Sequence, residues 1–158
     1  MNHNLSKSFD GVSPDTKWFV VANRSNAAIF SEGTDHQFHF VSRFENPNGK
    51  LTEGQLDSDK PGRCFSAGSS IVRHALDRHF TKHEQVAIVF AIRIGKFLGL
   101  SFQNHKFDEI TLVAEPHFLG LLREHLPVAV HKAKIHSLDR EFDQGSTKEI
   151  REMILKAM

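Results

Sequence analysis

Apolar residues gather in five short stretches of the chain, which polar and turn-forming segments separate. They are residues 17–22, 27–31, 37–44, 109–115 and 134–138. Runs of roughly four to eight such residues between Asn, Gly, Asp and Ser are typical of β-strands. The first and fourth stretches are almost continuously apolar, which favours strands buried on both faces. The pattern therefore predicts five strands.

The third stretch alternates between apolar and polar residues, which predicts a half-exposed strand. With regular alternation, Phe38, Phe40 and Ser42 lie on one face, and His39, Val41 and Arg43 lie on the other. If this strand lies at the edge of a sheet, it could pair with a strand from a partner protein.

Three helices are indicated by capping signals and by apolar residues at helical spacing. Thr81 and Glu84 form a capping box that starts a helix expected to end near Gly99. Pro116 suits the first turn of a second helix, because the missing N–H costs nothing there. Ser146 and Glu149 form another capping box, and Ile150 and Ile154 of its helix should point inward. Residues 70–80 form a further short helix in this interpretation.

The elements follow the order strand, strand, strand, helix, strand, helix, strand, helix. This βββαβαβα series predicts a single α/β domain with a mixed sheet, in which an antiparallel meander is followed by parallel strands. A ribonuclease-H-like arrangement is one fold with this series. Residues 1–16 are polar and are expected to be a disordered lead. The domain is therefore placed at residues 17–158.

Composition excludes few classes of function. The 158 residues carry a formal net charge of +1, so any nucleic-acid site must come from local clustering of charge. The single cysteine, Cys64, allows no internal disulfide. The first 16 residues contain no apolar signal segment, and Arg93 and Lys96 interrupt the longest apolar stretch. We therefore expect a cytoplasmic protein without a membrane span.

The polar stretch between the third strand and the capping box at Thr81 is locally basic. Between Lys60 and His83 the only acidic residue is Asp77. Basic residues and glycine in such a loop can bind phosphates or an RNA backbone. The candidate RNA- or phosphate-binding residues are Lys60, Gly62, Arg63, Arg73, His74, Arg78 and Lys82. The alternative is a solvated basic face without a ligand.

Other kinds of chemistry are less well supported. His79 and His83 have the spacing of two metal ligands on one helical face, but an N-cap at Thr81 would separate them. A two-metal nuclease would need acids near the positions of Asn23, Glu84 and Glu115, and the first of these is an amide. We predict no metal, no cofactor and no complete catalytic set.

Several segments resemble a known bacterial family. They are residues 18–30, 56–68, 73–76, 82–84, 107–127 and 138–142. The chain resembles the host-attachment family, often described as proteins required for attachment to host cells, over roughly residues 17–155. That family is similar to the middle domain of eukaryotic and archaeal peptide-chain release factors, whose long loop bears Gly-Gly-Gln. The corresponding loop here spans residues 58–70 and contains no Gly-Gly-Gln; the nearest glutamine is Gln55.

Three functions follow from these observations as expectations. The first is a non-enzymatic domain that contacts ribosomal or transfer RNA through its basic loop, as the resemblance to release factors implies. The second is a protein-interaction module that affects attachment to host cells. The third is a hydrolase of RNA esters or phosphodiesters, for which the sequence supplies no clustered set of acids.

Overall fold

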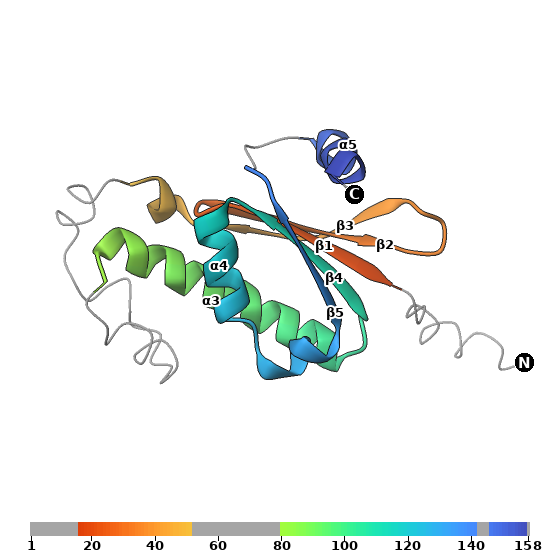
Figure 1. The fold of residues 1–158 in the computed structure, drawn as a ribbon, viewed down its shortest axis with the longest axis horizontal. Coiled ribbons are helices and arrows are strands. Elements are labelled where there is room, and N and C mark those ends of the chain that lie inside the picture. The colour runs from red at the N-terminus through yellow and green to blue at the C-terminus, as the bar shows by residue number, and fades with distance from the viewer. Residues whose placement is uncertain (1–15, 52–79, 142–145, 158) are drawn as a thin grey trace, which may run out of the picture.

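The protein is an α/β domain built on one mixed sheet, as the sequence predicts. A computed structural model describes residues 16–51, 80–141 and 146–157 (Figure 1). The five strands lie in the order β3-β2-β1-β4-β5. Their bounds are β1 Lys17–Ala22, β2 Asn26–Glu32, β3 Phe38–Glu45, β4 Glu109–Ala114 and β5 Lys134–Asp139. Strands β1, β2 and β3 pair antiparallel, whereas β4 is parallel to both β1 and β5.

In the described parts of the chain, three α-helices pack on the sheet, and two short 3₁₀ helices join elements. They are α3 Lys82–Gln103, α4 Pro116–Glu124, α5 Thr147–Ala157, η1 Pro47–Lys50 and η2 Val128–Lys132. Figure 1 shows α3 and α4 on one face of the sheet and α5 on the other. The first face buries Val20, Ile29 and Leu112 against α3 and α4. The second buries Phe19 and Phe30 against Ile150 and Ile154 of α5.

The predicted helix starts are confirmed. Thr81 is the N-cap of α3, and its side-chain oxygen accepts a hydrogen bond from the Glu84 amide at 3.2 Å. The capping box before α5 is reciprocal. The Ser146 hydroxyl accepts from the Glu149 amide at 3.3 Å, and the Glu149 carboxylate accepts from the Ser146 amide at 2.7 Å. The predicted helix at residues 70–80 falls, except for Phe80, outside the described residues, as does the predicted lead except for Thr16.

The predicted end of α3 near Gly99 is wrong, because the helix continues to Gln103. Gly99 serves close packing instead of ending the helix. A Cβ added there would lie 2.8 Å from Cγ of Pro127. Gly95, one turn earlier, is still closer to this segment, since its added Cβ would lie 2.7 Å from the carbonyl oxygen of His125. Two glycines on one side of α3 therefore let the chain after α4 lie directly against the helix.

The regular alternation predicted for β3 is also wrong in its second half. The register shifts between Ile29 and Phe30, which pair with Ser42 and Phe40 respectively. Val41 is thus an extra residue, as in a β-bulge. Directly opposed residues share a face, so Phe40 lies on the α5 face with Phe30, and Ser42 lies on the opposite face with Ile29. A bulge cannot be read from alternation alone.

Helix α3 is the central helix of the domain. Among the described residues it is the one helix long and apolar enough to cross a membrane, with a mean hydropathy of 1.6 over the best 18 residues. Of that window, 61% is buried inside the fold. Arg93 and Lys96 are exposed, whereas Ile94 and Leu98 are fully buried. This distribution is that of a core helix with one solvent-facing side.

Candidate functional site

Most of the candidate RNA- or phosphate-binding residues predicted from the sequence lie outside the described residues. These are Lys60, Gly62, Arg63, Arg73, His74 and Arg78. Lys82 is described; it is the first residue of α3 and is half-buried. The next residue, His83, belongs to a cluster of polar side chains, and the other members come from segments near the adjacent end of the sheet. We describe this cluster as the candidate site.

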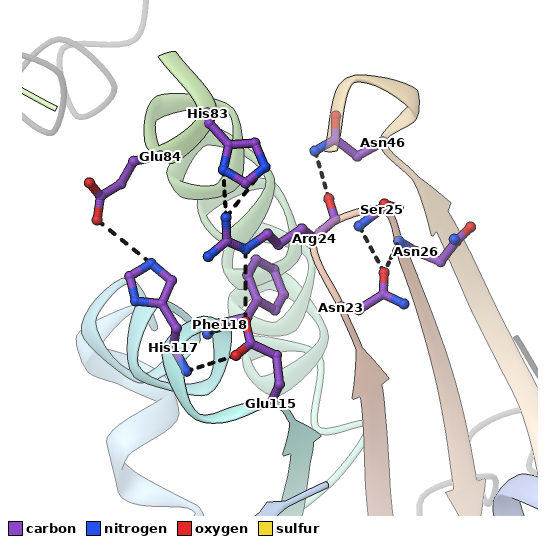
Figure 2. Close-up of polar contacts among 10 residues, drawn as sticks. All are labelled: Asn23, Arg24, Ser25, Asn26, Asn46, His83, Glu84, Glu115, His117 and Phe118. Carbon is purple, nitrogen blue, oxygen red and sulfur yellow. Dashed lines mark hydrogen bonds and ion pairs between the residues drawn. The ribbon is translucent and has the colours of Figure 1, made fainter. Parts of the chain in front are cut away.

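The cluster lies where two parallel strands end and two helices begin. Strand β1 ends at Ala22 and β4 ends at Ala114, and the two strands are parallel neighbours. Ligand sites in open α/β sheets commonly lie outside the carboxyl ends of such strands. Figure 2 shows Arg24 reaching from the turn after β1 toward the first turn of α3 and the start of α4.

Arg24 is the centre of the cluster. Its Nη1 donates to Nδ1 of His83 at 2.7 Å, and its Nε lies 3.8 Å from Oε1 of Glu115 (Figure 2). Nη1 also lies 3.4 Å from Nε2 of His83. A guanidinium has donors only, so the imidazole nitrogen that accepts this hydrogen bond carries no proton. The Arg24 and Glu115 side chains are 28% and 27% exposed, so both can still be reached by a ligand from solvent.

The backbone of Arg24 is fixed from two sides. The Asn23 side-chain oxygen accepts hydrogen bonds from the amides of Ser25 and Asn26, both at 2.8 Å. This is the local turn that Asn forms readily with its own backbone. The Asn46 amide group donates to the Arg24 carbonyl at 2.9 Å. Gly49 packs so closely on that carbonyl that an added Cβ would overlap its oxygen.

The two acids of the cluster both have structural partners. Glu115 is the N-cap of α4, and its carboxylate accepts from the amides of His117 at 3.1 Å and Phe118 at 3.0 Å. Oε1 of Glu84 lies 3.6 Å from Nε2 of His117. The three positions considered for a two-metal site therefore have other roles. Asn23 stabilises its turn, Glu115 caps α4, and Glu84 pairs with His117. Among the described residues, no group of three or more His, Cys, Asp or Glu could hold a metal ion.

A comparison with protein families shows to which family the chain belongs. A family described as "Protein required for attachment to host cells" matches residues 18–154. The chain belongs to this family. No curated protein matches the sequence. The family supports a role in attachment to host cells, and the match covers every residue of the candidate site.

Two residues of this attachment-family site are not identified by the sequence analysis. Arg24 lies in a stretch that reads as a plain turn, and His117 follows a helix-starting proline. Their positions in the sequence could have identified them. Both follow a predicted strand of the parallel pair, and such strand ends meet at one edge of the sheet. The arrangement brings one guanidinium, two imidazoles and the amino end of α3 together, with Arg24 and His117 paired to the two acids.

Proposed function

We propose that this attachment-family protein is a non-enzymatic, release-factor-like domain that contacts RNA phosphates. The proposed contact residues are Lys60, Gly62, Arg63, Arg73, His74, Arg78 and Lys82. The proposed partner is ribosomal or transfer RNA, and the proposed location is the cytoplasm. The strand order β3-β2-β1-β4-β5, with β1 parallel to β4, is compatible with the ribonuclease-H-like arrangement expected from the sequence.

One observation carries the proposal. Described residues before and after the basic segment both contact Arg24. On the side that precedes it, Asn46 and Gly49 contact the Arg24 carbonyl. On the side that follows it, His83 accepts a hydrogen bond from the Arg24 side chain. The described residues on both sides of the basic segment therefore lie beside Arg24, which supports a role for this end of the sheet in the proposed contact.

The charge at this edge also favours an anionic ligand. Glu115 is engaged by the amino end of α4 and by Arg24, and Glu84 is engaged by His117. The amino end of α3 adds a partial positive charge next to Lys82. Between Lys60 and His83 the sequence adds five Lys or Arg residues against one acid, Asp77. RNA phosphates are the abundant ligands that such a surface attracts without a shaped pocket.

Binding of RNA over a range of salt concentrations tests the proposal. Transfer RNA and purified ribosomes are titrated with the wild-type protein and with a variant carrying Lys60→Ala, Arg63→Ala and Arg73→Ala. Each phosphate contact removed should lower the slope of log K against log salt by about 1. The matched control carries Lys106→Ala, Lys132→Ala and Lys156→Ala, which removes the same charge from exposed residues near the opposite end of the sheet, where Asp108, Lys134 and Leu155 lie. Equal slopes for the two triple variants would reject the proposal.

A second candidate function is recognition of a protein partner at β3. The strand lies at the edge of the sheet, and Phe40 on its α5 face is 61% exposed. An edge strand with an exposed aromatic residue is suited to strand addition by a partner. Attachment to host cells separates the two candidates. Loss of attachment with Phe40→Glu, but not with the basic triple variant, favours this second function.

A further inference from the structure

A hollow lies at the end of the sheet opposite the Arg24 cluster. It is bounded by the starts of β1, β4 and β5, by the turn between β2 and β3, and by the last turn of α5. Its volume is about 660 Å³. Pockets that bind small molecules usually measure roughly 300–1,000 Å³. The hollow is therefore large enough for a small organic ligand.

The inner part of the hollow is apolar. Phe19 of β1 stacks on Phe38 of β3, with ring centroids 4.7 Å apart. Ile154 and Leu155 of α5 complete this surface, and Leu155 is 54% exposed. An exposed leucine beside a stacked aromatic pair offers an apolar ligand group a surface to cover.

Arg151 connects two segments that form the wall of the hollow. Its Nη2 donates to the carbonyl of His36 at 3.4 Å, and its guanidinium lies 5.8 Å from the ring centre of Phe38. The contact joins α5 to the turn between β2 and β3. Both sides of the hollow are thus held in place by the fold.

Charges of alternating sign line the rim. Glu32 of β2 is opposite Lys17 of β1, Lys17 is opposite Glu109 of β4, and Glu109 is opposite Lys134 of β5. Directly opposed residues lie on the same face of a sheet. Lys17 shares the α5 face with Phe19, because the two are separated by two positions along β1. The four side chains therefore form one row across the mouth of the hollow.

Part of this row is already paired within the protein. Glu109 lies 4.0 Å from Lys17 and 3.1 Å from His136, and Glu32 lies 3.4 Å from His36. Within residues 16–51, 80–141 and 146–157, the side chains of Asp108 and Lys134 make no ion pair or hydrogen bond. Their backbones touch, since the Lys134 amide donates to the Asp108 carbonyl at 3.0 Å. The rim thus carries one carboxylate and one ammonium group that have no ion pair with another described residue.

We propose that this hollow binds a small zwitterion with an apolar side chain, of the class of the hydrophobic α-amino acids. The carboxylate of the ligand pairs with Lys134, its ammonium pairs with Asp108, and its side chain covers Phe38 and Leu155. A simple anion would face the carboxylates of Glu32, Asp108 and Glu109, and a simple cation would face Lys17 and Lys134. A wholly apolar ligand would desolvate the rim charges without compensation. A zwitterion meets both signs of charge.

Calorimetry and amide NMR on the full chain test the proposal with defined probes. L-phenylalanine and L-leucine should bind and shift the amide signals of Phe38, Asp108 and Leu155. N-acetyl-L-phenylalanine lacks the ammonium, L-phenylalanine amide lacks the carboxylate, and glycine lacks the side chain. The N-acetyl compound and the amide should bind about tenfold more weakly or worse, because each loses one charge-assisted hydrogen bond. Glycine should also bind about tenfold more weakly or worse, because it buries no apolar surface on Phe38 and Leu155.

Variants of the protein test which rim residue binds each charge of the ligand. Lys134→Gln should weaken binding of L-phenylalanine and leave binding of its amide unchanged. Asp108→Asn should also weaken binding of L-phenylalanine, but it should leave binding of the N-acetyl compound unchanged. Lys132→Gln and Asp139→Asn remove equal charges from exposed residues that do not line the hollow, and they should bind like the wild type. Thermal unfolding of each variant shows that it is folded. No binding of either amino acid, or equal binding of all five probes, would overturn the proposal.

Discussion

Arg24 and His83 lie 59 positions apart in the chain, and Nη1 of Arg24 donates to Nδ1 of His83 at 2.7 Å. The bond joins the carboxyl end of β1 to the first turn of α3. Arginine can only donate, so His83 accepts this hydrogen bond. The pair thus helps to set the geometry at the end of the sheet where we propose that RNA binds.

A double-mutant cycle should detect the coupling between these two side chains. We expect Arg24→Met and His83→Phe to be non-additive, with a coupling energy of about 1 kcal/mol, as for a hydrogen bond to a charged group near the surface. Urea unfolding of the wild type, both single variants and the double variant measures it. Arg93→Met combined with His83→Phe is the control pair and should be additive. A coupling energy near zero would show that the pair does not stabilise the fold.

Gly49 should be needed to place Arg24. A Cβ at this position would overlap the Arg24 carbonyl oxygen, which belongs to backbone and cannot rotate away. We expect Gly49→Ala to destabilise the protein by about 1–3 kcal/mol, the usual cost of forced overlap in a packed region. Gly33→Ala is the matched control in another turn, since its nearest neighbour, Oδ1 of Asp35, would lie 3.6 Å away. Chemical denaturation of the two variants should separate them clearly.

Elements with a local signal were predicted well from the sequence. The caps at Thr81 and Ser146 and the proline that starts α4 each act within one helical turn. The mixed sheet follows from the order of these elements. The end of α3 was predicted wrongly because a glycine in a helix can mark either a stop or a close contact. Only the position of Pro127 in the fold shows that Gly99 is a contact.

Features that depend on distant pairing were not predictable. The bulge at Val41 depends on the register between β2 and β3. Arg24 and His83 come from different elements, so no local spacing relates them. The row Glu32, Lys17, Glu109 and Lys134 is assembled from four strands, whose order no single segment encodes. The basic stretch at residues 60–79 was found by its composition, and its role stays a prediction.

Gly95 should be the most sensitive glycine of α3. An added Cβ would lie 2.7 Å from the carbonyl oxygen of His125. Although alanine favours a helix over glycine by up to about 1 kcal/mol, we expect Gly95→Ala to lower stability, because the overlap costs about 1–3 kcal/mol. Gly120→Ala in α4 is the matched control, since nothing lies within 4 Å of its added Cβ. It should raise the melting temperature, whereas Gly95→Ala should lower it.

Asp35 should titrate at lower pH than an ordinary aspartate. The backbone amide of Gln37 donates to its carboxylate at 3.0 Å and His39 lies beside it, and these hydrogen bonds lower the pKa of Asp35. A lowered pKa stabilises the folded state above the ordinary pKa of aspartate, and that contribution is lost as pH falls through the folded value. Carbon NMR of the Asp35 carboxyl should give a midpoint below 3.8. His39→Ala should move the midpoint upward, and an unchanged midpoint would contradict the assignment.

The capping box before α5 should control how firmly this helix covers its face of the sheet. Ser146→Ala removes the hydroxyl that accepts from the Glu149 amide, and an N-cap serine contributes about 1 kcal/mol. We expect faster amide hydrogen exchange throughout α5, with little change in α3, because α5 packs mainly through Ile150 and Ile154. Thr147→Ala, also exposed but not the capping residue, is the control. If the hollow under α5 binds amino acids as proposed, saturating L-phenylalanine should slow exchange in α5 of Ser146→Ala back toward the wild-type rate.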